Sequence, residues 1–174
     1  MPWGIPPLLA DEEGEDEMKL LIRQRVFSWT DTYDIYDERE NPCFFVEAEF
    51  FTLGHQIHVN DVGTGQEVGS VHQKLFSLMP QFELVIGGMD MGYIRKEFSL
   101  FHPCYHLSMN GWQVQGDVFG WEYDVVDQGG RCVMHITKEL FHWGDTYVLD
   151  IPEERNVLLC LLIAIAIDAA NCGD

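Results

Sequence analysis

The sequence predicts a mainly β fold, a closed antiparallel barrel of about twelve strands around a hydrophobic helix at the C-terminus. One observation is a phenylalanine that recurs at intervals of 21 to 25 residues, each time followed two positions later by tryptophan or leucine. The pairs are Phe27/Trp29, Phe51/Leu53, Phe76/Leu78, Phe98/Leu100, Phe119/Trp121 and Phe141/Trp143. A fixed period of strand-forming residues indicates one supersecondary unit used repeatedly. The other observation is an uninterrupted apolar run over residues 157–167.

Each repeat contains two breaks, and the strands are expected between them. One break is a turn signal such as Gly87-Gly88 or Asn110-Gly111, which supplies the positive φ that tight hairpins need. The other break surrounds the phenylalanine. Two breaks per unit leave two short strands, and six units give about twelve. We expect strands near 19–27, 32–37, 43–50, 55–60, 67–75, 81–86, 91–98, 104–109, 112–118, 121–126, 131–139 and 145–150.

The apolar run predicts a buried central helix over about residues 153–170. Pro152, Glu153 and Glu154 precede it and suit the first turn of a helix. A helix that is apolar all round must be buried. Eleven residues extend about 16 Å, short of the roughly 30 Å of a bilayer core, so the length favours a core helix over a transmembrane segment. Twelve strands enclose a lumen too wide for side chains alone to fill, and a helix about 10–12 Å across can plug it.

Composition predicts one acidic domain behind an acidic leader. The chain has 174 residues, is 47% hydrophobic and has a formal net charge of -19. We expect residues 1–17, with six acids and no base, to be a disordered leader, and residues 18–174 to be the barrel domain; Met18 is a candidate start. Acidity argues against nucleic-acid binding, which depends on Lys and Arg. Five widely spaced cysteines without CxxC, and no signal peptide, predict a cytoplasmic location.

The basic residues near the repeat phenylalanines are the first candidates for a site. They are Arg25, Lys74, Arg95, Lys96 and Lys138. Equivalent repeat positions lie at one level of a barrel, so these cations could form a patch for a phosphate or a phospholipid headgroup. The alternative is cross-strand ion pairing with acids such as Glu97 and Glu139.

The remaining polar candidates are fewer. Asp168 ends the apolar run and is expected at a barrel mouth, as a partner of backbone amides or a nearby hydroxyl, or as a ligand-binding group. His102 and His106 could converge with Cys104, but no metal motif supports a metal site. The sequence contains no catalytic signature, so no catalytic residue, metal or cofactor is assigned. The tryptophans at 29, 121 and 143 are expected to pack at corners, and the repeat phenylalanines are interpreted as hairpin corners rather than site residues.

Several motifs resemble the LURP-one-related family. They are MKLLIRQRVFSWTDTYDIYD at 18–37, KLF at 74–76, FGWEYDVVD at 119–127, KELFHWGDTYVLDI at 138–151 and AIDAANC at 166–172. The family is grouped with the tubby C-terminal domain and the phospholipid scramblases, and the resemblance implies a twelve-stranded barrel around a hydrophobic central helix. Tubby domains bind phosphoinositides through a basic surface and scramblases act at membranes, whereas this chain is acidic.

Two functional hypotheses follow. The first is a non-enzymatic binding or scaffold domain of the LURP-one-related type, whose partner would be a phospholipid headgroup or a membrane protein. The second is an enzyme or small-ligand carrier with a pocket at a barrel mouth near Asp168 and the histidines, where carboxylate and imidazole groups would converge.

Overall fold

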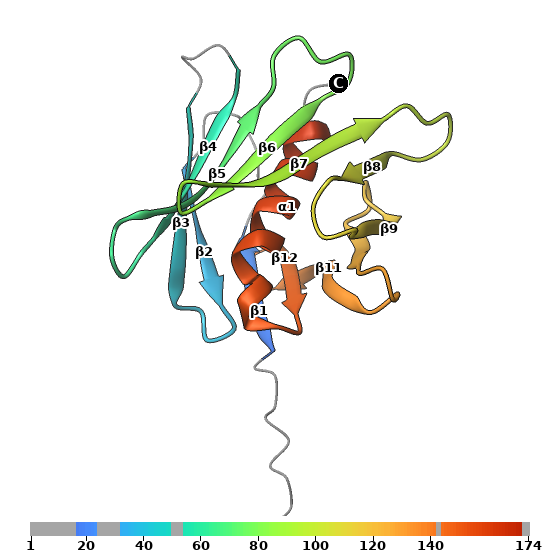
Figure 1. Cartoon of the computed structure of the whole chain (residues 1–174). Coiled ribbons are helices and arrows are strands. Elements are labelled where there is room, and N and C mark those ends of the chain that lie inside the picture. The colour runs from blue at the N-terminus through green and yellow to red at the C-terminus, as the bar shows by residue number, and fades with distance from the viewer. Residues whose placement is uncertain (1–16, 24–31, 50–53, 142–143, 172–174) are drawn as a thin grey trace, which may run out of the picture.

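The computed structural model describes residues 17–23, 32–49, 54–141 and 144–171. Twelve antiparallel strands form a closed barrel around one helix (Figure 1). The strands are β1 (Met18–Arg23), β2 (Tyr33–Asp37), β3 (Pro42–Glu49), β4 (Gln56–Asp61), β5 (Glu67–Gln73), β6 (Gln81–Ile86), β7 (Met89–Glu97), β8 (Cys104–Leu107), β9 (Gln113–Asp117), β10 (Glu122–Val126), β11 (Cys132–Phe141) and β12 (Gly144–Ile151). The predicted leader lies outside these residues, apart from Glu17.

All twelve predicted strands are present, and their bounds differ by a few residues. The predicted strands ending at 75 and 98 are too long, because β5 ends at Gln73 and β7 at Glu97. Phe76, Phe98 and Phe119 therefore lie in connecting loops, whereas Phe141 is the last residue of β11. Each strand pairs with the next, and β1 pairs with β12 to close the barrel. Closure leaves no exposed sheet edge.

Residues 153–170 were predicted as one helix, and the structure divides this segment. A short 3₁₀ turn, η1 (Glu154–Asn156), precedes α1 (Val157–Asn171). Nearly all of α1 is buried inside the barrel. Gly69 of β5 faces the helix closely, since a Cβ built there would lie 3.1 Å from Cδ1 of Leu162. Glycine thus lets this part of the wall approach α1.

No helix in the described ranges is both long and apolar enough to span a membrane. The 15 residues of α1 rise about 22 Å, against roughly 30 Å for a bilayer core. This agrees with the prediction of a core helix.

The two ends of the barrel differ in their connections. We call one the turn end: it holds the tight turns after β2, β4, β6 and β10 and the start of α1. Aspartates organise three of these turns, because the Oδ1 atoms of Asp37, Asp61 and Asp127 accept hydrogen bonds from backbone N–H groups at 2.7–2.8 Å. We call the other the rim end: it holds the loops 74–80, 98–103 and 118–121 and the last turn of α1 (Figure 1).

Candidate binding site at the rim end of the barrel

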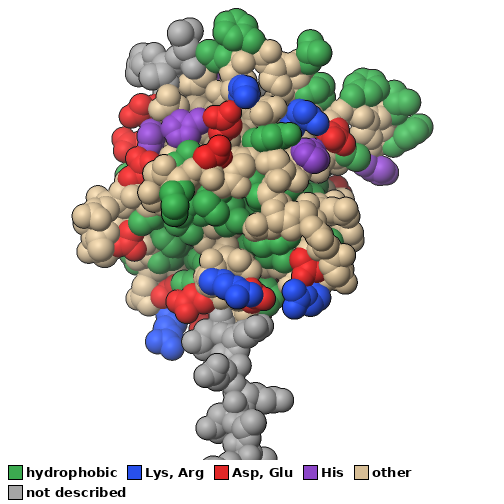
Figure 2. All heavy atoms as spheres, viewed as in Figure 1, with side chains coloured by type: hydrophobic (Ala, Val, Ile, Leu, Met, Phe, Trp, Pro, Cys, Tyr) green, Lys and Arg blue, Asp and Glu red, His purple; other side chains and the backbone are tan. Residues whose placement is uncertain are grey.

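The exposed apolar side chains gather at the rim end. Ten large hydrophobic side chains are exposed among the described residues. Only Val62 and Met89 belong to the turn end. The other eight lie in rim-end loops or, for the last of them, near the rim end of β11: Leu75, Phe76, Leu78, Phe98, Leu100, Phe101, Phe119 and Leu140. Figure 2 shows hydrophobic side chains protruding at the upper end of this face, with charged side chains directly below them and around the lower end.

The repeat phenylalanines were expected to be structural corners, and this is only half right. Phe76, Phe98 and Phe119 do lie where one strand gives way to the next. However, Phe98 and Phe119 are 80% and 63% exposed and Phe76 is fully exposed, so they do not pack in the core. Phe27 and Phe51, and the side chain of Phe141, lie outside the described residues. A period of two strands returns the chain to the same end each time, so the repeat itself predicts a shared rim.

The conformation of Phe76 is unusual for its residue type. Its φ of 63° lies in the left-handed region, which bulky side chains rarely adopt. Such strain costs about 1–3 kcal/mol and is typical of functional positions. Trp121 has a similar φ of 58° but is half-buried, with its ring 4.1 Å from the ring of Tyr147. Trp121 thus packs at a corner as predicted, whereas Trp29 and Trp143 lie outside the described residues.

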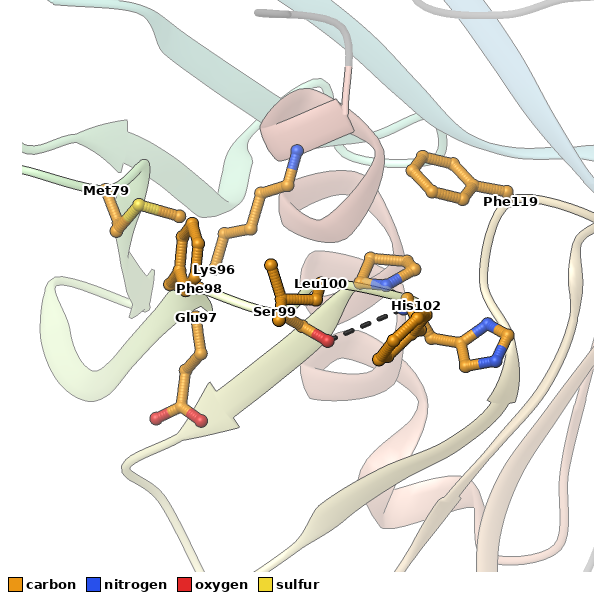
Figure 3. A pocket seen from close by; sticks show the side chains of 10 residues that line it. Met79, Lys96, Glu97, Phe98, Ser99, Leu100, His102 and Phe119 are labelled. Atoms are coloured by element: carbon orange, nitrogen blue, oxygen red, sulfur yellow. Dashed lines mark hydrogen bonds between the residues drawn. The ribbon is translucent and has the colours of Figure 1, made fainter.

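A pocket of about 330 Å³ opens between the loop 98–103 and neighbouring segments (Figure 3). Its wall is divided about evenly between polar and apolar surface, and Lys96, Glu97, Ser99 and His102 bring the polar side chains. The apolar lining residues are Met79, Phe98, Leu100, Phe101, Pro103 and Phe119. The pocket therefore combines aromatic side chains with a lysine, a glutamate, a serine and a histidine.

Lys96 faces the inside of the barrel. It is the second residue after Ile94, which is fully buried, and residues two apart on a strand share a face. Its cross-strand partner on β8 is Tyr105, whose hydroxyl donates a hydrogen bond to Oδ1 of Asn171 in the last turn of α1. Lys96 is only 8% exposed, and Figure 3 shows its side chain extending beside α1. A cation suits this place, because the C-terminal end of a helix carries partial negative charge.

The other predicted cations do not join Lys96. Lys74 and Arg95 lie on the outer face, in one row on either side of Gln81. Nζ of Lys74 lies 3.3 Å from Oε1 of Glu83. Nη2 of Arg95 lies 3.8 Å from Oε1 of Glu97. These two thus follow the ion-pair alternative rather than the open patch.

Lys138 and Arg25 complete the predicted set. Lys138 is exposed near the rim end of β11, on the face it shares with buried Ile136, and it interacts with another group of the protein. Arg25 lies outside the described residues. The structure therefore divides the described cations between the two faces of the barrel wall.

Asp168 lies at the rim end of the lumen, as the sequence predicted. It is buried in the last turn of α1 and takes part in interactions within the protein. Burial raises the pKa of the Tyr33 and Tyr123 hydroxyls, and the nearby charge of Asp168 raises both further. The Asp168 carboxyl therefore lies near these two hydroxyl groups.

The histidines are spread over the barrel. His58 contacts Glu67 and His135 contacts Asp124, with nitrogen–oxygen distances of 2.9 and 2.7 Å. Both histidine side chains point outward, because successive residues of a strand face opposite sides and the residues on either side of each histidine are buried. His102 lines the pocket, while the His106 ring lies 5.8 Å from the Tyr93 ring. In the described part of the chain no three His, Cys, Asp or Glu residues form a group suited to a metal ion.

Comparison with known proteins identifies the family. The family model described as LURP-one-related matches residues 18–168. The chain belongs to the LURP-one-related family. It is also 36% identical, over 157 residues, to an uncharacterized protein of Bacillus subtilis (strain 168), YxjI, covering 90% of this chain and 96% of YxjI.

A solved structure supports the fold. The chain resembles the crystal structure of a protein from Arabidopsis thaliana with a TM-score of 0.62 and 15% sequence identity. The match covers 90% of this chain and 93% of the plant protein. The predicted fold class, a tubby C-terminal-like barrel with a central helix, is confirmed.

Proposed function

We propose that this LURP-one-related chain is a non-enzymatic binding domain that attaches to phospholipid membranes through its rim end. The observation that carries the proposal is the one-sided distribution of exposed apolar side chains, eight of ten at the rim end of the described structure. Contiguous exposed apolar surface marks an interaction site. Loops that present phenylalanine and leucine suit insertion between lipid headgroups.

The energetics favour attachment by apolar insertion. Burying one phenylalanine or leucine side chain contributes about 1.5–3 kcal/mol. The loops 74–80 and 98–103 present six such side chains: Leu75, Phe76, Leu78, Phe98, Leu100 and Phe101. Two or three inserted side chains supply enough free energy for reversible binding. Lys74 and Arg95 add little, because each is paired with a glutamate.

One pair of described residues has the spacing of a catalytic nucleophile and its base, but it is buried. Oγ of Ser70 lies 2.9 Å from Nε2 of His72, the distance expected of a nucleophile and its base. However, Ser70 is only 2% exposed, within the barrel wall. A substrate cannot reach its hydroxyl there.

The test is flotation of the full-length protein with phosphatidylcholine vesicles. We expect the wild type to float, and Phe76→Asn/Leu78→Ser to lose about tenfold in partitioning, equivalent to about 1.4 kcal/mol. Asparagine is chosen because it tolerates the left-handed backbone of Phe76. The matched control is Val62→Ser/Met89→Ser, which removes the exposed apolar side chains of the turn end and should leave flotation unchanged.

Two results would overturn the proposal. One is a wild-type protein that binds no vesicle, and the other is an equal loss in the rim-end and turn-end variants. Sedimentation velocity of the same proteins tests the alternative that the rim end binds a second copy of the chain. A wild-type dimer that the rim-end variant converts to monomer would assign the rim to self-association instead.

A further inference from the structure

We infer that the rim pocket around Lys96 binds an amphiphile with an anionic head and a single acyl chain. The head would contact the Lys96 ammonium, and the chain would lie against Phe98, Leu100 and Phe119. The inference rests on the proposed function for the source of the ligand, since membranes supply such molecules. Binding itself requires no bilayer.

The size and lining of the pocket match this ligand class. A volume of about 330 Å³ lies near the lower bound of the roughly 300–1,000 Å³ of ligand pockets, so it suits one chain rather than two. An amphiphile needs both apolar wall for its chain and polar groups that fix its head, and the lining of this pocket is divided about evenly between the two. Here the aromatic rings of Phe98 and Phe119 provide the apolar wall, and Lys96 provides a charged group beside it.

Lys96 selects for negative charge. Its burial weakens solvent screening, so a charge-assisted contact there is stronger than on the surface. The ammonium has three donors, so its interaction within the protein still allows contact with a ligand. A neutral head would bring no negative charge to the Lys96 ammonium, so it should bind more weakly than an anionic head.

Glu97 also lines the pocket, but its carboxylate points away from Lys96. The strand alternation that turns Lys96 inward turns Glu97 outward. Its carboxylate lies 3.8 Å from the guanidinium of Arg95, and Figure 3 shows it pointing away from the Lys96 side chain. The carboxylate of Glu97, the acid next to Lys96 in the sequence, is therefore paired with Arg95 on the outer face of the barrel.

The test is isothermal titration of the full-length protein with decanoate, decyl phosphate, decanol and acetate, each below its aggregation concentration. Decanoate and decyl phosphate should bind about one per chain and about tenfold or more tighter than decanol, the contribution of about 1.4 kcal/mol from one charge-assisted contact. Acetate, which lacks the chain, should not bind detectably. A preference for anions would oppose the overall charge of -19, so the protein's long-range field cannot produce it.

Variants separate the head site from the chain site. Lys96→Met keeps a long apolar side chain and should remove the preference for decanoate over decanol. Lys74→Met removes an exposed lysine and should change neither affinity. Phe98→Ser/Phe119→Ser alters only exposed side chains, so it should fold, and it should weaken decanoate and decanol alike. If Lys96→Met is unstable, the Phe98→Ser/Phe119→Ser variant still tests the proposal.

The outcomes also distinguish this inference from the proposed function. Phe76→Asn/Leu78→Ser should lose vesicle flotation and keep decanoate binding, since neither residue lines the pocket. Lys96→Met should keep vesicle flotation. Equal affinities for decanoate and decanol in the wild type, or unchanged decanoate affinity in Phe98→Ser/Phe119→Ser, would overturn the inference. Neither result would contradict membrane attachment.

Discussion

Lys74 and Lys96 show how far the surroundings decide the role of a residue. Both stand two positions before a repeat phenylalanine. Lys74 follows the end of β5 on the outer face and pairs with Glu83, whereas Lys96 lies within β7 and faces the lumen. An exposed ion pair contributes little stability. A lysine buried beside an apolar pocket can instead discriminate between ligands.

The aspartates of the turn end predict acid sensitivity. Backbone hydrogen bonds lower the pKa of Asp37 and Asp127, and the side-chain and backbone hydrogen bonds of Thr64 lower that of Asp61. A carboxylate whose folded-state pKa is lowered stabilises the fold above its unfolded value of about 3.9. This stabilisation is lost as the pH falls through the lowered folded-state pKa.

Asp127→Asn should therefore unfold more readily than the wild type at pH 6, and the difference should shrink as the pH falls below about 3.9. Urea unfolding at pH 6, 4 and 3 measures the difference in the free energy of unfolding between the variant and the wild type. Glu38→Gln, an exposed substitution in another turn, serves as control and removes the general effect of losing one negative charge. A constant difference across the pH series would show that the carboxylate charge of Asp127 contributes nothing.

Among the elements, α1 supplies the continuous core. Its sequence is apolar on every face, and the surrounding barrel buries the residues from Leu159 to Ala170. Leu162 packs directly against Gly69 of β5, where the missing side chain lets the wall approach the helix. Helix and wall each need the other: the strands alone enclose an unfilled lumen, and the helix alone exposes an apolar surface.

Leu162→Ala should destabilise the protein by about 2–5 kcal/mol, because it removes a fully buried side chain and leaves a cavity. Leu158→Ala, one turn earlier and only half-buried, is the matched control with a smaller loss expected. Equilibrium denaturation in urea measures both. Equal losses at the two positions would contradict the observed burial.

The whole molecule is polarised between its ends, and its charge decides which membrane it suits. Exposed apolar side chains concentrate at the rim end, while the net charge of -19 belongs to the entire chain. The described cations at the rim end are paired or turned inward. Apolar insertion should therefore attract the protein to a bilayer, and long-range electrostatics should oppose anionic lipid.

Vesicles containing phosphatidylglycerol should consequently bind less protein than phosphatidylcholine vesicles at about 10 mM salt, and the difference should narrow at about 150 mM. The screening length falls from about 30 Å to about 8 Å between these conditions. Co-flotation across the salt series measures the effect, with the neutral vesicles as control. Tighter binding to the anionic vesicles at low salt would instead indicate a dominant cationic surface.

The sequence predicted the architecture because its signals are local and repeated. Gly87-Gly88 and Asn110-Gly111 mark turns, and the apolar run at 157–167 favours a buried core helix over a transmembrane segment. Lys96 was among the predicted candidates, but its inward orientation was not recognised. The repeat itself argues against a site at the phenylalanines, because a residue that recurs in every unit is interpreted as a hairpin corner.

By itself, then, the sequence determined the number of strands, the closed barrel, the central helix and the family, since each depends on periodicity and length along the chain. The tertiary structure alone decided which side of the wall each cation occupies, which acids pair with Lys74 and Arg95, and how Lys96, Phe98 and Phe119 surround one pocket. The physical reason is register. A shift of one residue at the end of a strand moves a side chain to the opposite face, and strand ends are where local sequence signals are weakest.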